Sequence, residues 1–460
     1  MGSTRDFDVI VIGAGPAGEH CAGRLADAGL RVAIVERERV GGECDYWACI
    51  PSKTLLRPGE ALQAAREAPG AREAVSGGVR PEGAFEWRDF MVAEYEDGAK
   101  AAYLEGKGIK VLRGGARLAG PGSVEVDEET YRTDHVVIAT GSDPVFPPVP
   151  GLDELEGVWT NREVTALTEV PRRLLVLGGG PVGVEMAQAV HRLGASVALV
   201  EGANHVLPRE PKPLGDALGE ALAADGIELR FGEHASRVRR EGDEYVVEFE
   251  RGDDLRGDRL LVATGRRARA DGIGLETVGV EPTRQGVPVD ARMRVADGVW
   301  AIGDATGVWP LTYVGKYQGR VAADNIRGRD RTANYDAVPR VIFTDPQAAA
   351  VGEPEGALSA TVPLSEVPRT STYTRAYAER PGFMTLLSDG ERLTGAYALG
   401  PEAGEWLQQA TVAIRARVPL PVLIDVIQPF PSFSEAFLST LSELEAQTVN
   451  QQPSLTPLAT

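Results

Sequence analysis

The sequence predicts an α/β fold, because one unit of strand, glycine-rich turn, helix and strand occurs twice in the chain. The first copy covers residues 7–36 and the second covers residues 174–201. Beyond about residue 333 the chain has strand and helix patterns but no further glycine-rich turn of this kind. We therefore expect two domains of one type, each with a parallel sheet, followed by a third α/β domain.

The first unit starts with the short, mostly apolar run Phe7 to Ile12, which has the composition of a strand. The turn GAGPAG (residues 13–18) follows at once, and a helical pattern continues through Leu25. A second apolar strand, Val32 to Val35, ends at Glu36. This is the dinucleotide-binding pattern: the glycines let the backbone approach a pyrophosphate, the helix N-terminus attracts it, and the acid accepts from a ribose diol.

The second unit repeats this order with the strand Leu174 to Leu177, the turn GGGPVG (residues 178–183), a helix through Leu193 and the strand Val197 to Val200. Glu201 lies eighteen residues after the last glycine of its turn, as Glu36 does. A single glycine fingerprint is a weak signal, whereas two complete copies with equal spacing indicate two dinucleotide sites.

Glu201 bears on the identity of the second dinucleotide. A carboxylate at this position accepts from a free ribose hydroxyl and repels a 2′-phosphate, which favours NAD(H) over NADP(H). No arginine occurs between Glu201 and Arg209 to accommodate a phosphate. The alternative is that Glu201 is only a solvated strand end.

In three further segments a β-rich run is terminated by a glycine: HVVIATGS (residues 135–142), LLVATGR (260–266) and VWAIGDAT (299–306). The last ends at Gly303-Asp304, where an aspartate is either a helix cap or a binding residue. We assign residues 1–142 and 271–333 to the first domain, 143–270 to an inserted second domain and 334–460 to the third. In the third we expect strands over 341–351, 384–387 and 395–399 and a helix over 405–415.

Composition limits the function classes. The 460 residues carry a net charge of −19, so the average surface repels nucleic acids and anionic membranes. No run reaches the roughly eighteen apolar residues of a membrane span, and Met1 to Asp8 has no pattern of a secretory signal. We expect a cytoplasmic protein with neither a nucleic-acid nor a membrane partner.

Two of the three cysteines, Cys44 and Cys49, lie in the segment GGECDYWACIPSK (residues 41–53), and the third is Cys21. A zinc site needs about four ligands, and no second cysteine pair exists to complete one. In a reducing compartment a close cysteine pair is more often catalytic or metal-binding than a structural disulfide. On a regular helix five residues rise about 7.5 Å, more than a disulfide spans, so the segment must turn if the two bond.

Taken together, these motifs resemble those of the FAD-dependent pyridine nucleotide-disulfide oxidoreductases, such as dihydrolipoyl dehydrogenase, glutathione reductase and mercuric reductase. The resemblance covers nearly the whole chain, and it is carried by GAGPAG, GGECDYWACIPSK, both ATG segments, GGGPVGVE, IGDAT, FTDPQAAAVG and PSFSEAF. It implies an FAD domain, an NAD(P)H domain and a C-terminal interface domain. It also implies a homodimer, in which the interface domain supplies residues to the partner's disulfide site.

The resemblance assigns roles to individual residues. Cys49 would be the charge-transfer thiol near the flavin, Cys44 the interchange thiol facing substrate, and Lys53 would pair with Glu185 beside the flavin; an ordinary surface ion pair is the alternative. Glu435 is the remaining catalytic candidate. The residues implied to bind FAD are Gly13, Gly15, Gly18, Glu36, Gly42, Lys53, Ala116, Thr140, Gly141 and Asp304. Those implied to bind NAD are Gly178, Gly180, Gly183, Glu201 and Gly265.

The chain departs from the family pattern near its end. Disulfide-reducing members carry His-x-His-Pro-Thr-x-Ser-Glu, but this chain has Gln428 and Phe430 at the two histidine positions, and none of its histidines follows residue 234. A positioned acid–base group contributes about 10² to 10⁴-fold to rate, so its loss predicts a poor dihydrolipoyl dehydrogenase. Glu435 remains, as an interface hydrogen-bonding residue or a catalytic one. Phe430 and Phe433 are either packing residues or the apolar wall of an altered pocket.

Other departures also bear on the substrate. Mercuric reductases carry a C-terminal cysteine pair, and no cysteine follows Cys49 here. Tyr46 and Trp47 precede the second cysteine, where the family commonly has glycine nearby, and their rings either pack in the core or form a ligand platform.

The leading hypothesis is an enzyme that passes electrons from NADH through FAD to the Cys44–Cys49 disulfide and on to a small disulfide or dithiol. The alternative keeps both cofactors but delivers electrons to quinones, metal ions or O₂, or runs as a dithiol oxidase, without exchange at the cysteines. A redox-sensing protein that binds both cofactors and turns over negligibly stays open.

Overall fold

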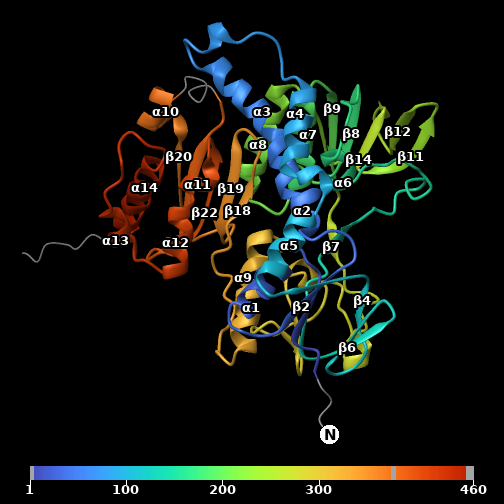
Figure 1. Ribbon diagram of the computed structural model, residues 1–460. Coiled ribbons are helices and arrows are strands. Elements are labelled where there is room, and N and C mark those ends of the chain that lie inside the picture. Colours follow the sequence, from blue (N-terminus) through green and yellow to red (C-terminus); the bar gives the residue numbers. More distant parts are fainter. Residues whose placement is uncertain (1–4, 374–379, 452–460) are drawn as a thin grey trace, which may run out of the picture.

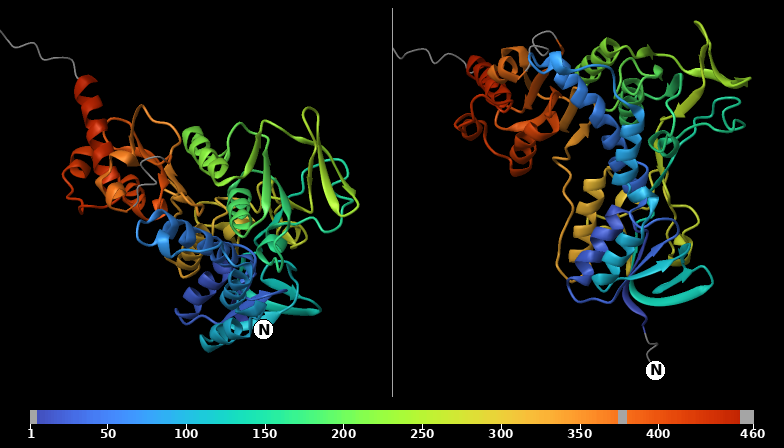
Figure 2. Two further views of the ribbon diagram at one scale, coloured as in Figure 1. Left: turned by 90° about the horizontal axis from the view of Figure 1, so that it is seen from above. Right: turned by 45° about the horizontal axis from the view of Figure 1, so that its top comes forward.

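The computed structural model describes residues 5–373 and 380–451. Three α/β regions lie around the long helix α3 (Cys49–Glu67), as Figure 1 shows. The views of Figure 2 also place the C-terminal region to one side of the other two. Among the described residues no helix is both long enough and apolar enough to cross a lipid bilayer.

The first region contains an eight-stranded sheet in which β1 lies between β2 and β6, parallel to both. Its strands are β1 (Phe7–Ile12), β2 (Val32–Glu36), β3 (Lys110–Arg113), β4 (Ala116–Leu118), β5 (Ser123–Val126), β6 (Glu129–Ile138), β16 (Arg294–Ala296) and β17 (Val299–Ala301). Helix α1 (Pro16–Ala26) follows the first glycine turn and packs against α9 (Thr312–Ile326). The predicted first strand–turn–helix–strand unit is confirmed.

The second region contains a four-stranded parallel sheet in the order β10-β9-β8-β14. These strands are β8 (Arg173–Leu177), β9 (Ser196–Glu201), β10 (Glu228–Phe231) and β14 (Arg259–Val262), accompanied by helices α7 (Pro181–Arg192) and α8 (Lys212–Asp225). An antiparallel sheet of β11 (Ala235–Glu241), β12 (Glu244–Phe249) and β13 (Leu255–Gly257) lies beside them. The predicted second unit is confirmed.

Two short strands join these regions. β7 (Ser142–Pro144), after β6, pairs antiparallel with β15 (Arg266–Ala268), after β14. The chain therefore leaves the first sheet and returns to it through neighbouring segments. The domain boundaries that we assigned from the sequence stay predictions.

The third region is an antiparallel sheet in the order β18-β19-β22-β21-β20, with helices packed on it. The strands are β18 (Arg340–Ile342), β19 (Gln347–Gly352), β20 (Leu358–Pro363), β21 (Phe383–Ser388) and β22 (Leu393–Gly400). The helices are α10 (Pro368–Tyr373), α11 (Ala403–Trp406), α12 (Gln408–Ala416), α13 (Leu420–Ile424) and α14 (Glu435–Gln451).

The segment 341–351, which we expected to be sheet, contributes two strands, β18 and β19, and the chain turns between them. Pro346 lies in this turn, where it needs no ladder hydrogen bond from its nitrogen. The helix predicted over 405–415 corresponds to α11 and α12, which meet at Leu407.

The helices α2 (Gly42–Tyr46), α4 (Pro81–Met91) and α6 (Asn161–Thr165) contact α3, and α5 (Gly98–Gly106) packs on β3. The 3-10 turns are η1 (Arg72–Ala74), η2 (Ala93–Tyr95), η3 (Leu275–Val278), η4 (Gly303–Thr306) and η5 (Leu364–Glu366). Leu55 and Leu56 of α3 are buried in one apolar cluster with residues of α7 and β22. A Cβ on Gly59 would lie 2.8 Å from Arg192 Cδ, so α3 and α7 are in close contact. The helix that begins at Cys49 is thus held between the second and third regions.

Candidate active site

The first glycine turn supports the segment that carries the cysteines. Gly41 and Gly42 have φ of +116° and +59°, which favours glycine, and they lead into α2. The Gly41 N–H donates to Ala14 O at 2.7 Å, and a Cβ on Gly42 would lie 2.9 Å from Gly15 Cα. The two segments are therefore packed backbone to backbone, and no larger side chain fits between them.

A break in the helix brings Cys44 and Cys49 together. α2 ends at Tyr46 and α3 begins at Cys49, and Ala48 between them has φ −137° and ψ −99°. This confirms that the segment turns between the cysteines. Thr312 Oγ1 lies 3.4 Å from Cys44 Sγ and 3.3 Å from Cys49 Sγ, and both sulfurs are free thiols in this structure.

The two thiols differ in acidity. A hydrogen bond from Cys44 lowers the pKa of Cys49 to about 6, and contact with Thr312 and the charge of Lys53 act in the same direction. The same hydrogen bond raises the pKa of Cys44, and burial adds to the rise. The reduced pair therefore holds its negative charge on Cys49. Burial in α1 raises the pKa of Cys21 to about 12, as expected for an inert structural thiol.

Lys53 lies one turn after Cys49 on α3 and forms an ion pair with Glu185 of α7, at 2.7 Å between Nζ and Oε2. The other carboxylate oxygen accepts from the Phe343 N–H at 2.9 Å. Lys53 Nζ also lies 4.8 Å from the centre of the Phe343 ring. The structure thus pairs the two residues that the sequence paired, and the Glu185 side chain is only 6% exposed.

The first glycine turn fits a dinucleotide. A Cβ on Gly13 would lie 2.3 Å from Ala139 O, and one on Gly18 would lie 2.0 Å from Gly13 O, so both positions are closed by backbone. Gly15, at the N-terminus of α1, has nothing within 4 Å of an added Cβ. Glu36 Oε2 accepts from the Ala14 N–H at 2.9 Å, which holds the carboxylate beside this open position. A pyrophosphate needs such an open glycine at a helix N-terminus.

The second turn repeats this geometry. A Cβ on Gly178 would lie 2.5 Å from Ala263 O and one on Gly183 would lie 1.9 Å from Gly178 O, whereas Gly180 is open. Gly13 and Gly178 share the same φ of +107°. Glu201 Oε2 accepts from the Gly179 N–H at 2.7 Å. The two turns are thus equivalent in shape as well as in sequence.

Most other predicted cofactor residues lie at the carboxyl ends of the parallel strands. Thr140 and Gly141 follow β6, and Thr140 Oγ1 donates to Arg269 O at 2.6 Å. Asp304 follows β17 and accepts from Ser142 Oγ at 2.6 Å. Ala116 begins β4, three residues after the carboxyl end of β3, and Gly265 lies between β14 and β15 with open space around it. Their binding roles stay predictions.

The comparisons with known proteins agree with this geometry. A family model described as pyridine nucleotide-disulphide oxidoreductase matches residues 7–319, and the dimerisation domain of that family matches residues 338–441. The chain belongs to the pyridine nucleotide-disulphide oxidoreductase family. It is an FAD-dependent enzyme that uses NAD(P)H, the cysteine pair fits the redox disulfide of this family, and the dimerisation domain supports a homodimer.

Several members of the family resemble the chain over nearly its full length. A dihydrolipoyl dehydrogenase from Thermus scotoductus is 35% identical, over 97% of this chain and 99% of its own. A mercuric reductase from Shigella flexneri is 34% identical, over 98% of this chain and 82% of its own. Among solved structures, the HOCl-induced flavoprotein disulfide reductase RclA from Escherichia coli, as its Cu(II) complex, has a TM-score of 0.84 at 26% identity, covering 96% of this chain and 100% of its own.

The C-terminal motif separates into packed and exposed residues. Phe433 is buried and stacks on Trp406, which confirms the packing interpretation for that ring. Phe430 is 74% exposed and takes no part in the core of its own chain. Gln428 Nε2 donates to Gln409 Oε1, and Glu435 Oε2 accepts from the Ser432 N–H at 3.1 Å. Within its own chain Glu435 thus acts as a cap at the start of α14.

Sequence reasoning missed several residues of the site. Thr312 gave no signal beyond its place at the start of a helix, because only the fold brings it to the sulfurs. Asn161 and Arg162 of α6 both contact Trp47 between the cysteines, the first at its carbonyl and the second at its ring. Tyr46 and Trp47 are 2% and 9% exposed and form a small core with Val92, so they pack rather than present a platform.

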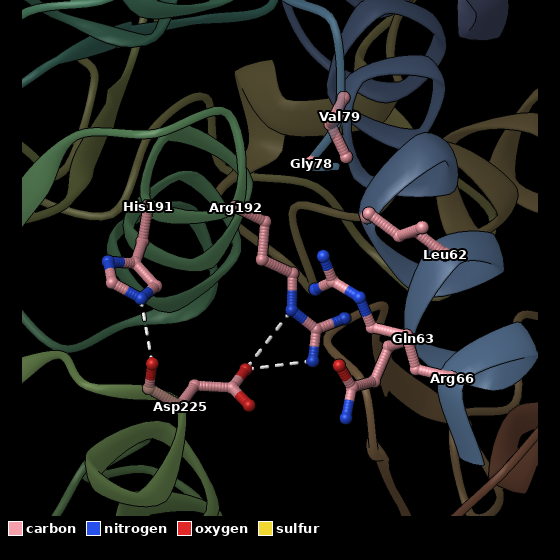
Figure 3. Close-up of a pocket in the computed structure, with 9 residues that line it drawn as sticks. Leu62, Gln63, Arg66, Gly78, Val79, His191, Arg192 and Asp225 are labelled. Atoms are coloured by element: carbon pink, nitrogen blue, oxygen red, sulfur yellow. Dashed lines mark hydrogen bonds and ion pairs between the residues drawn. The ribbon is translucent and has the colours of Figure 1, made fainter. Parts of the chain in front are cut away.

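A cavity of about 230 Å³ lies between α3 and α7 (Figure 3). None of the residues predicted for the site lines this cavity. Arg192 lies at its wall and donates to Asp225 Oδ2, and His191 Nε2 lies 2.7 Å from Asp225 O. Its lining residues are Gly59, Leu62, Gln63, Arg66, Gly78, Val79, His191, Arg192 and Asp225. On this wall Arg192 and His191 are therefore both bonded to Asp225.

Proposed function

We propose that the chain is an NADH-dependent enzyme that reduces small disulfides, and that Cys44 and Cys49 form the disulfide that exchanges with substrate. The observation that carries the proposal is the pair of free thiols that meet at Thr312, with their negative charge on Cys49. A thiolate beside a neutral thiol is the reduced form that a relay of this kind needs.

The reaction we propose is NADH + H⁺ + RSSR → NAD⁺ + 2 RSH. FAD would supply the chemistry that takes a hydride from NADH and passes the electron pair to the disulfide. The reduced pair then carries one proton on Cys44 and one negative charge on Cys49. Cys44 attacks one substrate sulfur while its proton goes to the first leaving thiolate, which departs as RSH. The Cys49 thiolate then attacks the Cys44 sulfur, which re-forms the enzyme disulfide and releases the second substrate thiolate, and that thiolate takes the H⁺ of the equation from solvent.

The preference for NADH is supported by Glu201. Its carboxylate is held at the end of β9 by hydrogen bonds from the N–H groups of Gly179 and Ala203. At this place a ribose diol can donate to it, whereas a 2′-phosphate meets a negative charge. We therefore propose NAD(H) over NADP(H). The cytoplasmic location expected from the sequence stays a prediction.

The missing histidine limits the substrate class. No histidine follows residue 234, so no imidazole of the third region can take the proton of Cys44. A disulfide whose thiols have a low pKa needs less proton transfer to its leaving group. We propose that such activated disulfides are reduced faster than alkyl disulfides.

The test is steady-state NADH oxidation with a panel of activated and alkyl disulfides. In Cys44→Ser we expect loss of disulfide turnover at unchanged FAD content. Cys21→Ala is the matched control, because that thiol is buried in α1 away from the site, and it is expected to keep parental turnover. Undiminished disulfide turnover in Cys44→Ser would refute the proposal.

The absence of the histidine also favours a second candidate, in which quinones, metal ions or O₂ take the electrons without exchange at the cysteines. Under this candidate the acceptor is reduced equally fast by the parent, by Cys44→Ser and by Cys49→Ser. A dithiol oxidase is a third form of the reaction, and peroxide release without added NAD⁺ would identify it.

A further inference from the structure

The helix that carries Cys44 cannot hold its own position. α2 has only five residues, and isolated helices of that length are unstable in water. Contacts from other elements must therefore fix the distance between Cys44 and Cys49. At its N-terminal end the first glycine turn provides them, and Asp45 in its middle pairs with Lys100 of α5.

At the other end of α2 the contacts come from α6, more than a hundred positions away in the sequence. Asn161 Nδ2 donates to Trp47 O at 2.9 Å and to Glu43 Oε2 at 3.0 Å. Trp47 O belongs to the break between the cysteines, and Glu43 immediately precedes Cys44. One buried amide, 5% exposed, thus bonds both sides of the Cys44 turn.

Arg162 reinforces this contact from the outer side. Its Nε donates to Glu43 Oε1 at 2.8 Å, and its guanidinium lies 4.0 Å from the centre of the Trp47 ring. The same guanidinium donates to Glu38 at 2.8 Å. The side chain of Trp47 is therefore held at its face while its carbonyl is held by Asn161.

The amide of Asn161 also joins this segment to the predicted FAD region. Its Oδ1 accepts from Arg266 at 2.8 Å, and Arg266 donates to Ser142 Oγ at 2.8 Å. Ser142 Oγ in turn donates to Asp304 at 2.6 Å. The hydrogen bonds run without a gap from the cysteine segment through β15 and β7 to Asp304.

We infer that Asn161, reinforced by Arg162, is the positioning residue that sets the geometry of the Cys44–Cys49 couple. It fixes the break between the cysteines, so that each thiol stays within bonding distance of the other. Since a fixed approach raises the effective concentration of one thiol at the other, the network favours closure of the disulfide. It also maintains the hydrogen bond from Cys44 to the Cys49 thiolate. The inference rests on the proposed role of the cysteines.

The test measures the dithiol–disulfide equilibrium of the FAD-loaded enzyme in dithiothreitol redox buffers, and the pH profile of Cys49 alkylation by iodoacetamide. Asn161→Ala removes the amide, and Asn161→Asp keeps its shape and its acceptor for Arg266 but loses the donor. For both we expect the equilibrium constant for disulfide closure to fall at least tenfold, which is about 30 mV for a two-electron couple. We expect the alkylation midpoint to rise by about one pH unit or more.

Asn334→Asp is the matched control, because it makes the same change outside this network, where the amide donates to Asp336. Arg162→Lys tests the neighbouring residue, because it keeps the charge but loses the planar guanidinium. For this variant we expect the equilibrium constant for disulfide closure to fall at least threefold. If an Asn161 variant fails to bind FAD, Arg162→Lys alone decides. Parental values of both measurements in every folded variant would overturn the inference.

These outcomes are separate from a failure of the proposed function. A protein whose cysteines do not exchange with substrate is revealed by full turnover of Cys44→Ser, whereas the redox equilibrium is measured without any substrate. A role of Asn161 in folding alone would lower thermal stability but leave the equilibrium and the alkylation profile unchanged.

Discussion

Lys53 and Glu185 are 132 positions apart in the sequence, and their Nζ and Oε2 atoms lie 2.7 Å apart in the structure. The carboxylate is nearly buried and the ammonium is 35% exposed, so the pair lies between a surface and a core salt bridge. It joins the helix of Cys49 to the helix of the second glycine turn.

We expect this pair to contribute measurably to stability. A double-mutant cycle with Lys53→Met and Glu185→Leu is expected to give a coupling energy of about 1 to 3 kcal/mol in urea unfolding, between the ranges for exposed and buried pairs. The Arg117–Glu125 pair, 2.8 Å apart and more exposed, is the control and is expected to give less than about 1 kcal/mol. Equal coupling in the two cycles would contradict the special position of Lys53.

The acidity of Cys49 can be tested by alkylation of the reduced enzyme. Because the first cause of its lowered pKa is the hydrogen bond from Cys44, Cys44→Ala is expected to move the alkylation midpoint from about 6 toward the ordinary thiol value of 9.0. Cys44→Ser keeps a hydroxyl donor and is expected to lie between the two. An alkylation midpoint that stays near 6 in both variants would show that Lys53 and Thr312, rather than Cys44, set the pKa of Cys49.

The same ionisation predicts how stability depends on pH. The pKa of Cys49 is lower in the folded protein than the ordinary value of 9.0, so between about pH 6 and pH 9 the folded state binds fewer protons than the unfolded state. The stabilisation of the folded state by the Cys49 thiolate is complete above pH 9 and is lost as the pH falls through about 6. Urea unfolding of the reduced protein is therefore expected to gain stability over this window relative to Cys49→Ser, which lacks the group.

The two glycine turns predict a contrast between substitutions. Gly18→Ala and Gly183→Ala place a methyl group against backbone oxygen, and we expect each to destabilise the fold. Gly15→Ala and Gly180→Ala point into open space, so they are expected to leave the apoprotein stable. Gly15→Ala should lower FAD affinity at least tenfold, and Gly180→Ala should raise the KM for NADH at constant FAD content. If Gly15→Ala and Gly180→Ala bind FAD and NADH as the parent does, the dinucleotides bind elsewhere.

Coenzyme preference depends on Glu201 in our proposal. Glu201→Ser removes the carboxylate, and we expect the ratio of kcat/KM for NADH to that for NADPH to fall about tenfold, equivalent to about 1.4 kcal/mol. Glu241→Ser, on an exposed hairpin of the same region, is the control. A parental ratio in Glu201→Ser would exclude this carboxylate as the determinant.

The sequence was informative where function depends on local pattern. Both glycine turns, their strands and the break between the cysteines follow from residues close together in the chain, and the structure confirms them. It was silent where distant segments meet. Thr312 and Asn161 carry no unusual neighbours, and their importance comes only from packing that brings a helix start to two sulfurs and an amide to a carbonyl. The exposure of Phe430 and the burial of Phe433 also required the structure, since the two rings lie three residues apart.

Four apolar side chains, Val422, Val426, Ile427 and Phe430, stay in water on the isolated chain, and Ile427 is 94% exposed. They lie in the part of the chain that matches the dimerisation domain. If a second copy covers them, mass action links folding to association, and dilution weakens both. We therefore expect the midpoint temperature of thermal unfolding to increase with protein concentration. In Ile427→Asp we expect this dependence on concentration to be lost, while the dilute chain stays folded.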